Sequence, residues 1–503
     1  MNAELLLWLA VLAPATLALT AVFVRGVRLP LAIVAAGSSV AAILNALIAI
    51  FVLSRGPLLA GAGWLRVDAL SAYHLALLAL VGGGSGLYAV VYLAEEQRHG
   101  TLTIGQARTF AGLWCGTLAA LAFLLVSNNL GLMWVGLETT TLLTAFLIAL
   151  HVSRESLEAM WKYLLICSVA IAFAFMGTLL AAAAATTTHG APAHALFWTD
   201  LLAAAPRLNP ALMRTAFLFL VVGYGTKAGL APMHNWLPDA HSQAPAPVSA
   251  LFSGFMLNAA LYCTLRFIPV MNGVPGCAGW AQSLLVGFGI ISLLVGAGFI
   301  LFQRDAKRML AYCSVEHIGL IALGAGVGGL GTVAALLHSL NHSLAKGLAF
   351  FAIGRLGQAH GTHEIARVAG AVRTSRVWGV ALLASCLALV GAAPFATFLS
   401  ELLLIKAVFD TGRTLLFLTV LAALGLAFVG LMRHAIRLAW ARGDEPQRQI
   451  TVGSADVALV GLALAILLVL GVIIPTPLRQ AVEAAAGIVG AASPTALVAG
   501  ARP

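Results

Sequence analysis

Long apolar stretches follow one another along almost the whole chain, and this feature limits the fold more than any other. Of the 503 residues, 61% are hydrophobic and only 9% are charged, and the mean hydropathy is +0.99. Unbroken apolar stretches of about 20 residues are typical of transmembrane helices, whereas membrane β-barrels show short alternating segments. The sequence therefore predicts an all-α polytopic membrane protein with no soluble catalytic domain.

Hydropathy predicts about fourteen transmembrane helices, the first of which is a membrane span and not a signal peptide. The expected spans are 4–24, 30–53, 69–93, 108–127, 129–150, 156–185, 211–230, 245–268, 280–302, 308–327, 331–354, 377–405, 411–439 and 455–475. Counted together with the adjoining span ends, the connections after odd-numbered spans hold 16 lysines and arginines, against nine for the even-numbered connections and the tail. The excess predicts that odd connections face the cytoplasm and both termini face outside. The tail from Ala481 is either an interfacial helix or frayed.

Two segments that lie 162 residues apart are similar, and each interrupts an apolar helix with glycine and proline. Residues 229–239 (GLAPMHNWLPD) match residues 391–401 (GAAPFATFLSE) in glycine, alanine, proline, leucine, an aromatic residue and a terminal acid. Paired broken helices are typical of transporters built from repeats. We therefore predict two inverted five-helix repeats in which helices 7 and 12 are broken. The predicted domains are helices 1–3 (1–105), the first repeat (106–268), the second repeat (279–440), and helix 14 with the tail (441–503).

Lys227 and Lys346 lie deep within apolar stretches, where ionisable residues usually have a function. Arginine keeps its proton inside a protein, whereas a desolvated lysine can release it. Glu138 lies in the fifth predicted span, and an isolated buried carboxylate there is costly. We therefore expect Glu138 to pair with Lys227 and the two groups to control each other's protonation. A buried structural ion pair is the alternative.

A second group of titratable residues lies in the eleventh predicted span. His338, His342 and Lys346 are four residues apart, so they share one helix face and rise about 6 Å at each step. Histidine titrates near neutral pH, so this face forms a plausible proton relay. Satisfied core histidines are one alternative, and a zinc site is another that the neighbouring lysine opposes. Further candidates for the relay are Glu316, His317 and Glu401.

The first predicted helix break carries additional polar residues. His234, Asp239 and His241 follow it, and they either line a proton entry or hold the loop. Lys162 either lies between Glu138 and Lys227 or lies near the membrane interface beside Glu155 and Glu158.

Three long motifs make the chain resemble a known family. They are KAGLAPMHNWLPDAHSQAPAPVSAL (227–251), DAKRMLAYCSVEHIG (305–319) and HSLNHSLAK (338–346). The chain resembles the antiporter-like proton-pumping subunits of respiratory complex I, Mrp cation/proton antiporters and group 4 membrane-bound hydrogenases. Within this family, it is most similar to the F subunit of hydrogenase-4 and of related formate hydrogenlyase-like complexes. The resemblance implies a Glu138–Lys227 charge pair and a central lysine, Lys346, flanked by the two histidines.

The chain departs from the family at Ser253, where many members have histidine, and we expect Ser253 or Asn258 to hold water there. The resemblance implies a proton-translocating membrane subunit with no redox centre, cofactor or metal of its own. Its implied partners are other integral membrane subunits, a peripheral redox arm, the lipid bilayer and protons, and no nucleic acid. The implied location is the bacterial inner membrane.

Three other functions stay open at this point. They are a monovalent cation/proton antiporter subunit of Mrp type, a non-transporting scaffold, and a subunit that energises a non-redox partner such as inorganic carbon uptake. The six cysteines are scattered without a C-x-x-C pair, so we expect buried free thiols and no iron–sulfur or structural zinc site.

Overall fold

The computed structural model describes residues 3–186, 194–441 and 450–492. The helices of the first half are α1 (Ala3–Thr20), α2 (Arg28–Arg55), α3 (Ala69–Arg98), α4 (Ile104–Val126), α5 (Leu130–Ile148), α6 (Arg154–Thr186), α7 (Trp198–Ala204), α8 (Pro210–Ala228), α9 (Trp236–Gln243), α10 (Ala246–Leu251), α11 (Leu257–Leu265) and α12 (Ile268–Gly273). Those of the second half are α13 (Ala278–Ile300), α14 (Ala306–Val327), α15 (Leu330–His360), α16 (Ala371–Thr374), α17 (Arg376–Leu389), α18 (Ala396–Asp410), α19 (Thr414–Trp440), α20 (Ser454–Val472) and α21 (Thr476–Gly490). The short elements are β1 (Leu58–Ala60), η1 (Gly61–Gly63), β2 (Leu65–Val67), η2 (Ala205–Arg207) and a π-helix, η3 (Phe252–Met256).

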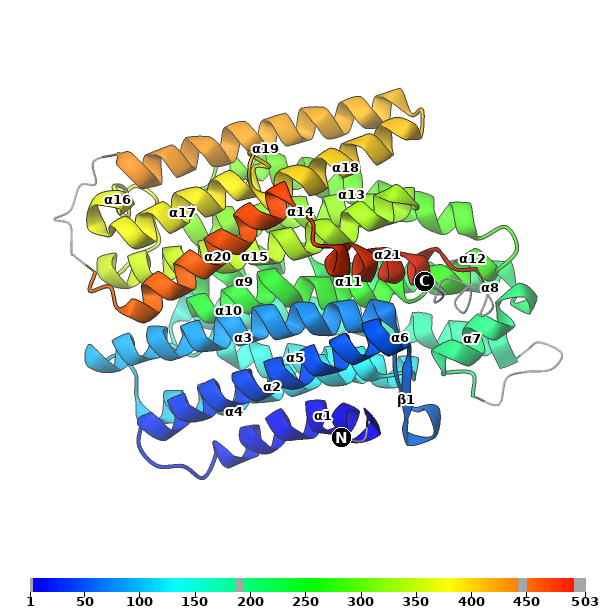
Figure 1. Ribbon diagram of the computed structural model, residues 1–503, viewed down its shortest axis with the longest axis horizontal. Helices are drawn as coiled ribbons and strands as arrows, with labels where there is room; N and C mark the ends of the chain where they lie inside the picture. Colours follow the sequence, from blue (N-terminus) through cyan, green and yellow to red (C-terminus); the bar gives the residue numbers. More distant parts are fainter. Residues whose placement is uncertain (1–2, 187–193, 442–449, 493–503) are drawn as a thin grey trace.

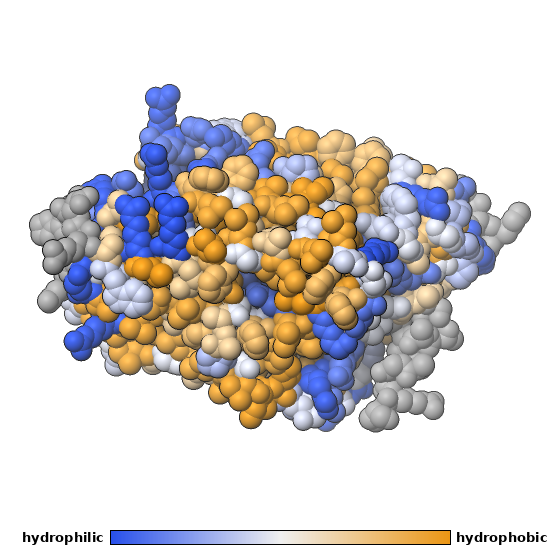
Figure 2. All heavy atoms as spheres, turned by 90° about the horizontal axis from the view of Figure 1, so that it is seen from above, coloured by the Kyte–Doolittle hydropathy of each residue, from blue (hydrophilic) through white to orange (hydrophobic). Residues whose placement is uncertain are grey.

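The long helices run side by side, with α1 at one edge of the bundle and α19 at the opposite edge (Figure 1). Apolar residues form a broad band across the middle, and hydrophilic residues gather at the two ends (Figure 2). Ten of the described helical segments are long and apolar enough to cross a membrane. The expected all-α polytopic membrane fold is therefore confirmed. The count of fourteen spans, the inverted repeats and the domain boundaries stay predictions.

The two ends of the bundle differ, and we name them by their contents. At the hairpin end, β1 pairs antiparallel with β2 over residues 58–67. Both described termini contact this end, because Gly61 N donates to Glu4 Oε1 at 2.9 Å and Asn272 Nδ2 donates to the carbonyl of Val489 at 3.3 Å. The opposite, basic end holds the C-terminus of α3 and the N-terminus of α14. There His151 hydrogen-bonds the Glu96 carboxylate, which raises the pKa of His151.

Two helices are broken at the glycines that the sequence analysis singled out. Gly229 ends α8 with a φ of +82°, and Gly391 follows α17 with a φ of +65°. Glycine reaches this left-handed region without steric cost, so the helix can end there. The chain then passes through Pro232 into α9 and through Pro394 into α18, and both prolines follow a cis peptide bond.

Helix α15 passes through the interior of the bundle and provides the centre of the site. Almost every residue from Gly331 to Gly357 is buried. The helix contacts α14, α17 and α18 on the side of the second break, and α3 and α10 on the other side. Because α15 is one continuous helix of 31 residues, it holds its polar side chains in a fixed row across the molecule.

Candidate functional site

The first buried lysine is held by hydroxyl groups. Lys227, near the end of α8, is fully buried, and its Nζ donates to Thr141 Oγ1 on α5 at 2.9 Å. It also donates to the hydroxyl of Tyr163 on α6 and lies 4.4 Å from the centre of that ring. Tyr163 Oη in turn lies 2.7 Å from Thr144 Oγ1. Three helices therefore contribute to one buried ammonium site.

The expected contact between Glu138 and Lys227 is not formed. Glu138 Oε1 accepts a hydrogen bond from Ser168 Oγ at 2.9 Å, and the second carboxylate oxygen has no partner among the described residues. Glu138 and Thr141 are three residues apart on α5, so they differ by one turn and about 60° around the helix. The Thr141 hydroxyl consequently occupies the position at Lys227 where the carboxylate was expected.

Lys162 lies at the basic end and not between Glu138 and Lys227. Its side chain is 45% exposed, and its Nζ contacts Glu158 Oε1 at 2.6 Å and Asp239 Oδ2 at 3.1 Å. Lys162 therefore contacts Glu158, as in the second alternative, because it lies only two turns from the start of α6; its location at the membrane interface stays a prediction. Asp239 also accepts a hydrogen bond from Arg308, so it joins α6, α9 and α14.

Both histidines of the first break, His234 and His241, are buried. His234 lies in the segment between α8 and α9, against the ring of Tyr312. His241 in α9 stacks on Phe350 of α15 with ring centres 4.9 Å apart, and neither of its nitrogens has a hydrogen-bond partner among the described residues. Unpaired buried nitrogens are normally satisfied by ordered water.

Ser253 lies in the π-helix that joins α10 to α11. Its Oγ is 2.8 Å from Ser314 Oγ on α14, so it bridges the two halves of the chain. Asn258, one turn further, donates to Ser343 Oγ on α15 at 3.1 Å. At Ser253 this chain therefore has a hydroxyl bridge between helices.

The second buried lysine lies where α14 faces α15. Lys346 is fully buried, and its Nζ donates to the carbonyl of Leu310 at 2.6 Å. Glu316 and Cys313 lie near it on α14 and are buried as well. A carboxylate and an ammonium group thus share one buried site in the second half of the chain.

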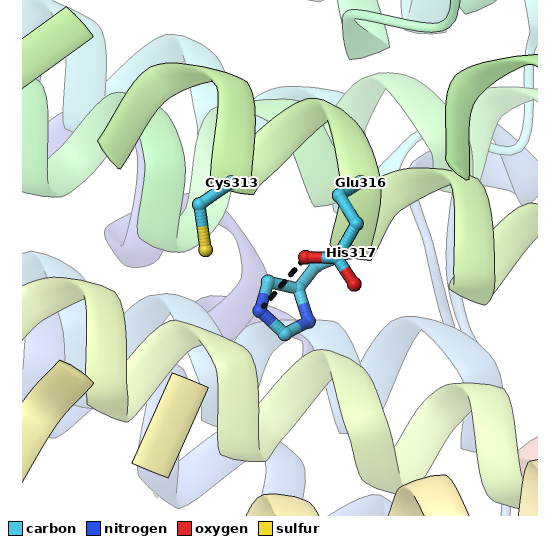
Figure 3. A group of neighbouring side chains, drawn as sticks. All are labelled: Cys313, Glu316 and His317. Carbon is cyan, nitrogen blue, oxygen red and sulfur yellow. Dashed lines mark ion pairs between the residues drawn. The ribbon is translucent and has the colours of Figure 1, made fainter. Parts of the chain in front are cut away.

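A row of imidazoles continues from this lysine towards the second break. Cys313, Glu316 and His317 point into the space between α14 and α15 (Figure 3). His317 Nδ1 lies 2.8 Å from His338 Nε2, and His338 Nδ1 lies 2.9 Å from Ser400 Oγ on α18. His342 contacts His317 ring to ring at 4.9 Å, and both of its nitrogens lack partners among the described residues.

Glu401 ends this row beside the second break. Its carboxylate is buried and lies so close to Gly391 that a Cβ on that glycine would come within 1.9 Å of Oε2. The ligand atoms of His317, His338 and Glu401 lie within 4.8 Å of one another, as do those of Cys313, Glu316 and His317. In the first set, His317 and His338 already hydrogen-bond each other, so a metal ion would have to replace that bond. The expected absence of a metal stays a prediction.

Comparison with known proteins identifies the family. The family described as NADH:quinone oxidoreductase/Mrp antiporter, TM matches residues 127–426. The chain belongs to this family. A hydrogenase-4 component F homolog from Methylacidiphilum infernorum (isolate V4) is 38% identical over 382 residues, which cover 75% of this chain and 80% of that protein.

Solved structures of the NADH:quinone oxidoreductase/Mrp antiporter family have the same fold. A chain of the Mrp complex from Dietzia sp. DQ12-45-1b aligns with a TM-score of 0.84 at 20% identity over 99% of both chains. A chain of respiratory complex I from Thermus thermophilus with bound Aureothin aligns with a TM-score of 0.73 at 25% identity, over 95% of this chain and 99% of that chain. This chain is therefore an antiporter-like membrane subunit.

The sequence analysis missed the neutral groups that connect the titratable residues of this antiporter-family site. Thr141, Tyr163, Ser168 and Ser400 all contact a predicted site residue. One signal was present in the sequence, because three consecutive threonines at 139–141 are unusual within an apolar span. The six cysteines are free and buried, as expected.

Proposed function

We propose that the chain carries protons through the membrane as one subunit of a redox-driven, hydrogenase-4-like or complex I-like assembly. The observation that carries the proposal is a series of titratable groups, half-buried at Glu138 and buried beyond it, on helices from α5 to α18 and beside both helix breaks. Such groups are costly inside a membrane, so where they occur they usually have a function such as proton transport. The chain needs no redox centre for this task, since the energy comes from its partners.

The proposed path begins at Glu138, on the side of the molecule where this carboxylate is partly exposed. It continues through the hydroxyls of Thr141 and Tyr163 to Lys227. Water near His241 and the Ser253–Ser314 bridge would then lead to the second half of the chain. From Lys346 the path follows His317 and His338 to Glu401. His234 and Asp239 remain candidates for the entry at the basic end.

A change of charge near Glu138 would drive the cycle. A neighbouring membrane subunit that places one charge about 6 Å from this carboxylate changes its energy by about 3 kcal/mol at an effective dielectric constant of 20. That is about a hundredfold change in an equilibrium constant. Transmission through Thr141 and Tyr163 would then change the proton occupancy of Lys227.

The test is proton pumping by the intact complex in membrane vesicles. Lys227→Arg keeps the positive charge but cannot release a proton, so we expect pumping to fall at least tenfold while the complex still assembles. Normal pumping in this variant would show that Lys227 is a structural cation. Glu138→Ala and Lys346→Ala should each abolish pumping as well, and the mechanism is wrong if both variants pump normally.

We further propose that the protein lies in the bacterial inner membrane with its basic end in the cytoplasm and both termini outside. The proposal is supported by the lysine and arginine excess at that end and by the contacts of both described termini with the hairpin end. Labelling of single cysteines placed at position 99 and at position 62 with a membrane-impermeant maleimide would test it. Labelling of position 99 from outside would contradict it.

A second candidate function is monovalent cation/proton exchange. The fold similarity to the Mrp complex supports it, and so do the two buried carboxylates, Glu316 and Glu401, that lie near each other. Sodium flux into proteoliposomes of the purified complex, or a sodium requirement for its activity, would favour exchange. Equal pumping with and without sodium would favour the proton pump.

A further inference from the structure

A buried ionic cluster closes the interior of the bundle at the hairpin end. Arg266 follows α11 and forms two hydrogen bonds with Asp68, at 2.6 Å and 2.8 Å. Asp68 is fully buried and caps the N-terminus of α3, while Arg266 is 5% exposed. Arg66 Nε lies 3.9 Å from the same carboxylate. Two guanidinium groups therefore face one carboxylate, and the cluster has an excess of one positive charge.

Polar side chains extend inward from this cluster between α3 and α11. Arg266 Nε donates to Tyr262 Oη at 2.8 Å, and this hydroxyl lies 2.9 Å from Ser71 Oγ. The His74 ring contacts the Tyr262 ring at 4.9 Å and the Tyr73 ring at 5.4 Å. A structural link between α3 and α11 needs only the ion pair, so these additional buried polar groups call for another explanation.

The same row reaches the central lysine through α15. Tyr73 Oη lies 3.2 Å from Ser339 Oγ and donates to the carbonyl of Leu336 at 2.5 Å. Ser339 and Lys346 are seven residues apart, so they lie on almost the same stripe of α15, about 10.5 Å from each other. Ser343 lies between them and donates to the carbonyl of Ser339 at 2.6 Å. Polar side chains therefore lie at intervals between Lys346 and Asp68, and water has to bridge the steps from Lys346 to Ser343 and from Tyr73 to Tyr262.

On the other side of the ion pair, a small cavity opens at the hairpin end. The residues that line it are Arg66, Ser127, Asn128, Leu130, Met133, Trp198 and Arg266. The side-chain oxygen of Asn128 is buried without a hydrogen-bond partner among the described residues. Arg66 and Arg266 both stand over the ring of Trp198, at 5.8 Å and 4.8 Å. The ion pair thus lies between the polar row and the cavity.

We propose that this row is a second proton outlet, and that the Asp68–Arg266 ion pair is its gate. The proposal rests on the proposed function, since Lys346 supplies the proton. A proton passes along the hydroxyls and the imidazole to the Asp68 carboxylate, which loses its charge and releases Arg266, and then to water in the cavity. When Asp68 is ionised, Arg266 holds it, and the positive excess repels protons that enter from the hairpin end. Arginine suits this role because it does not give up its own proton.

The gate predicts a leak when Arg266 is removed. In vesicles that hold the assembled complex, with no electron donor and an imposed pH gradient, Arg266→Gln should raise proton conductance at least fivefold. Adding Tyr73→Phe should return the conductance to the wild-type level, because it breaks the row further inside. The matched control is Arg214→Gln, since Arg214 lies at the same end and, among the described residues, hydrogen-bonds the Gly276 carbonyl and not the ion pair. This control should not leak.

If the Arg266→Gln complex assembles without a leak, the ion pair only holds α3 to α11. The same conclusion follows if the leak persists when Tyr73→Phe is added to Arg266→Gln. If Arg266→Gln does not assemble, Tyr73→Phe alone decides the question: driven pumping should fall about twofold, and unchanged pumping overturns the outlet. A failure of the proposed proton-pumping function gives a different result, because Lys346→Gln would then leave driven pumping intact.

Discussion

Removal of the Thr141 hydroxyl tests whether hydroxyl contacts control the proton occupancy of Lys227. Thr141→Val keeps the size and shape of the side chain but removes the acceptor that lies 2.9 Å from Lys227 Nζ. The matched control is Thr140→Val on the same helix. Thr140 is equally buried, and its hydroxyl donates to the carbonyl of Leu137 at 2.6 Å, within the helix. Both variants lose a buried hydroxyl, but only Thr141→Val changes the environment of the lysine.

The size of the effect follows from the lost hydrogen bond. A hydrogen bond to a charged group contributes about 1.5–3 kcal/mol, which corresponds to roughly a 10- to 150-fold change in the proton occupancy of Lys227. Tyr163 still accepts from the ammonium in the variant, so we expect the lower end of this range. Proton pumping should therefore fall about tenfold in Thr141→Val and less than twofold in Thr140→Val.

The assay is the quenching of an acridine dye in inverted vesicles that hold the intact complex, divided by the rate of electron transfer measured in the same vesicles. Electron transfer reports assembly, so a lower ratio reports a loss of coupling and not a loss of protein. Equal ratios in Thr141→Val and Thr140→Val would refute the conclusion that hydroxyl contacts control Lys227.

Two further predictions concern the second half of the chain. Lys346→Gln should abolish pumping, whereas Lys406→Gln should not change it, because Lys406 is exposed and pairs with Asp410. Equal pumping by the two variants in the dye-quenching assay would show that Lys346 has no central role. Gly391→Ala should reduce pumping at least fivefold, because its Cβ would displace the Glu401 carboxylate. Gly412→Ala is its control, since Gly412 has a similar φ of +69° but open space around it, and a matching loss in both variants would point to backbone strain instead.

Much of the fold was predictable because a membrane leaves few ways to satisfy the backbone. Hydropathy placed the ends of the long helices within about six residues of their observed bounds, and the glycines at 229 and 391 marked both breaks. The short elements were not predictable in this way. The β1–β2 hairpin, α7 and α12 lie in connections, where apolar periodicity carries little information. Part of the connection between the spans predicted at 156–185 and 211–230, residues 187–193, lies outside the described structure.

The composition of the candidate site was easier to predict than its contacts. Spacing placed His338, His342 and Lys346 on one buried face, and the structure agrees. The structure has no direct Glu138–Lys227 contact, although the two charges still interact, because opposite charges on neighbouring helices do not reveal the rotation of each helix. One turn of α5 decides whether a carboxylate or the Thr141 hydroxyl meets the lysine, and that rotation depends on packing across the whole bundle.

The absence of a direct contact between Glu138 and Lys227 has a physical advantage for a pump. Two opposite charges in contact, at about 4 Å, attract each other by about 4 kcal/mol at an effective dielectric constant of 20, and twice that separation halves the energy. A direct ion pair would hold both groups ionised through every step of a cycle. A weaker coupling of about 2 kcal/mol is still a thirtyfold bias on proton occupancy, but a neighbouring charge can reverse it. Thr141→Asp, which would place a carboxylate in direct contact with Lys227, should therefore block pumping as effectively as loss of the lysine, and a variant that pumps normally would contradict this view.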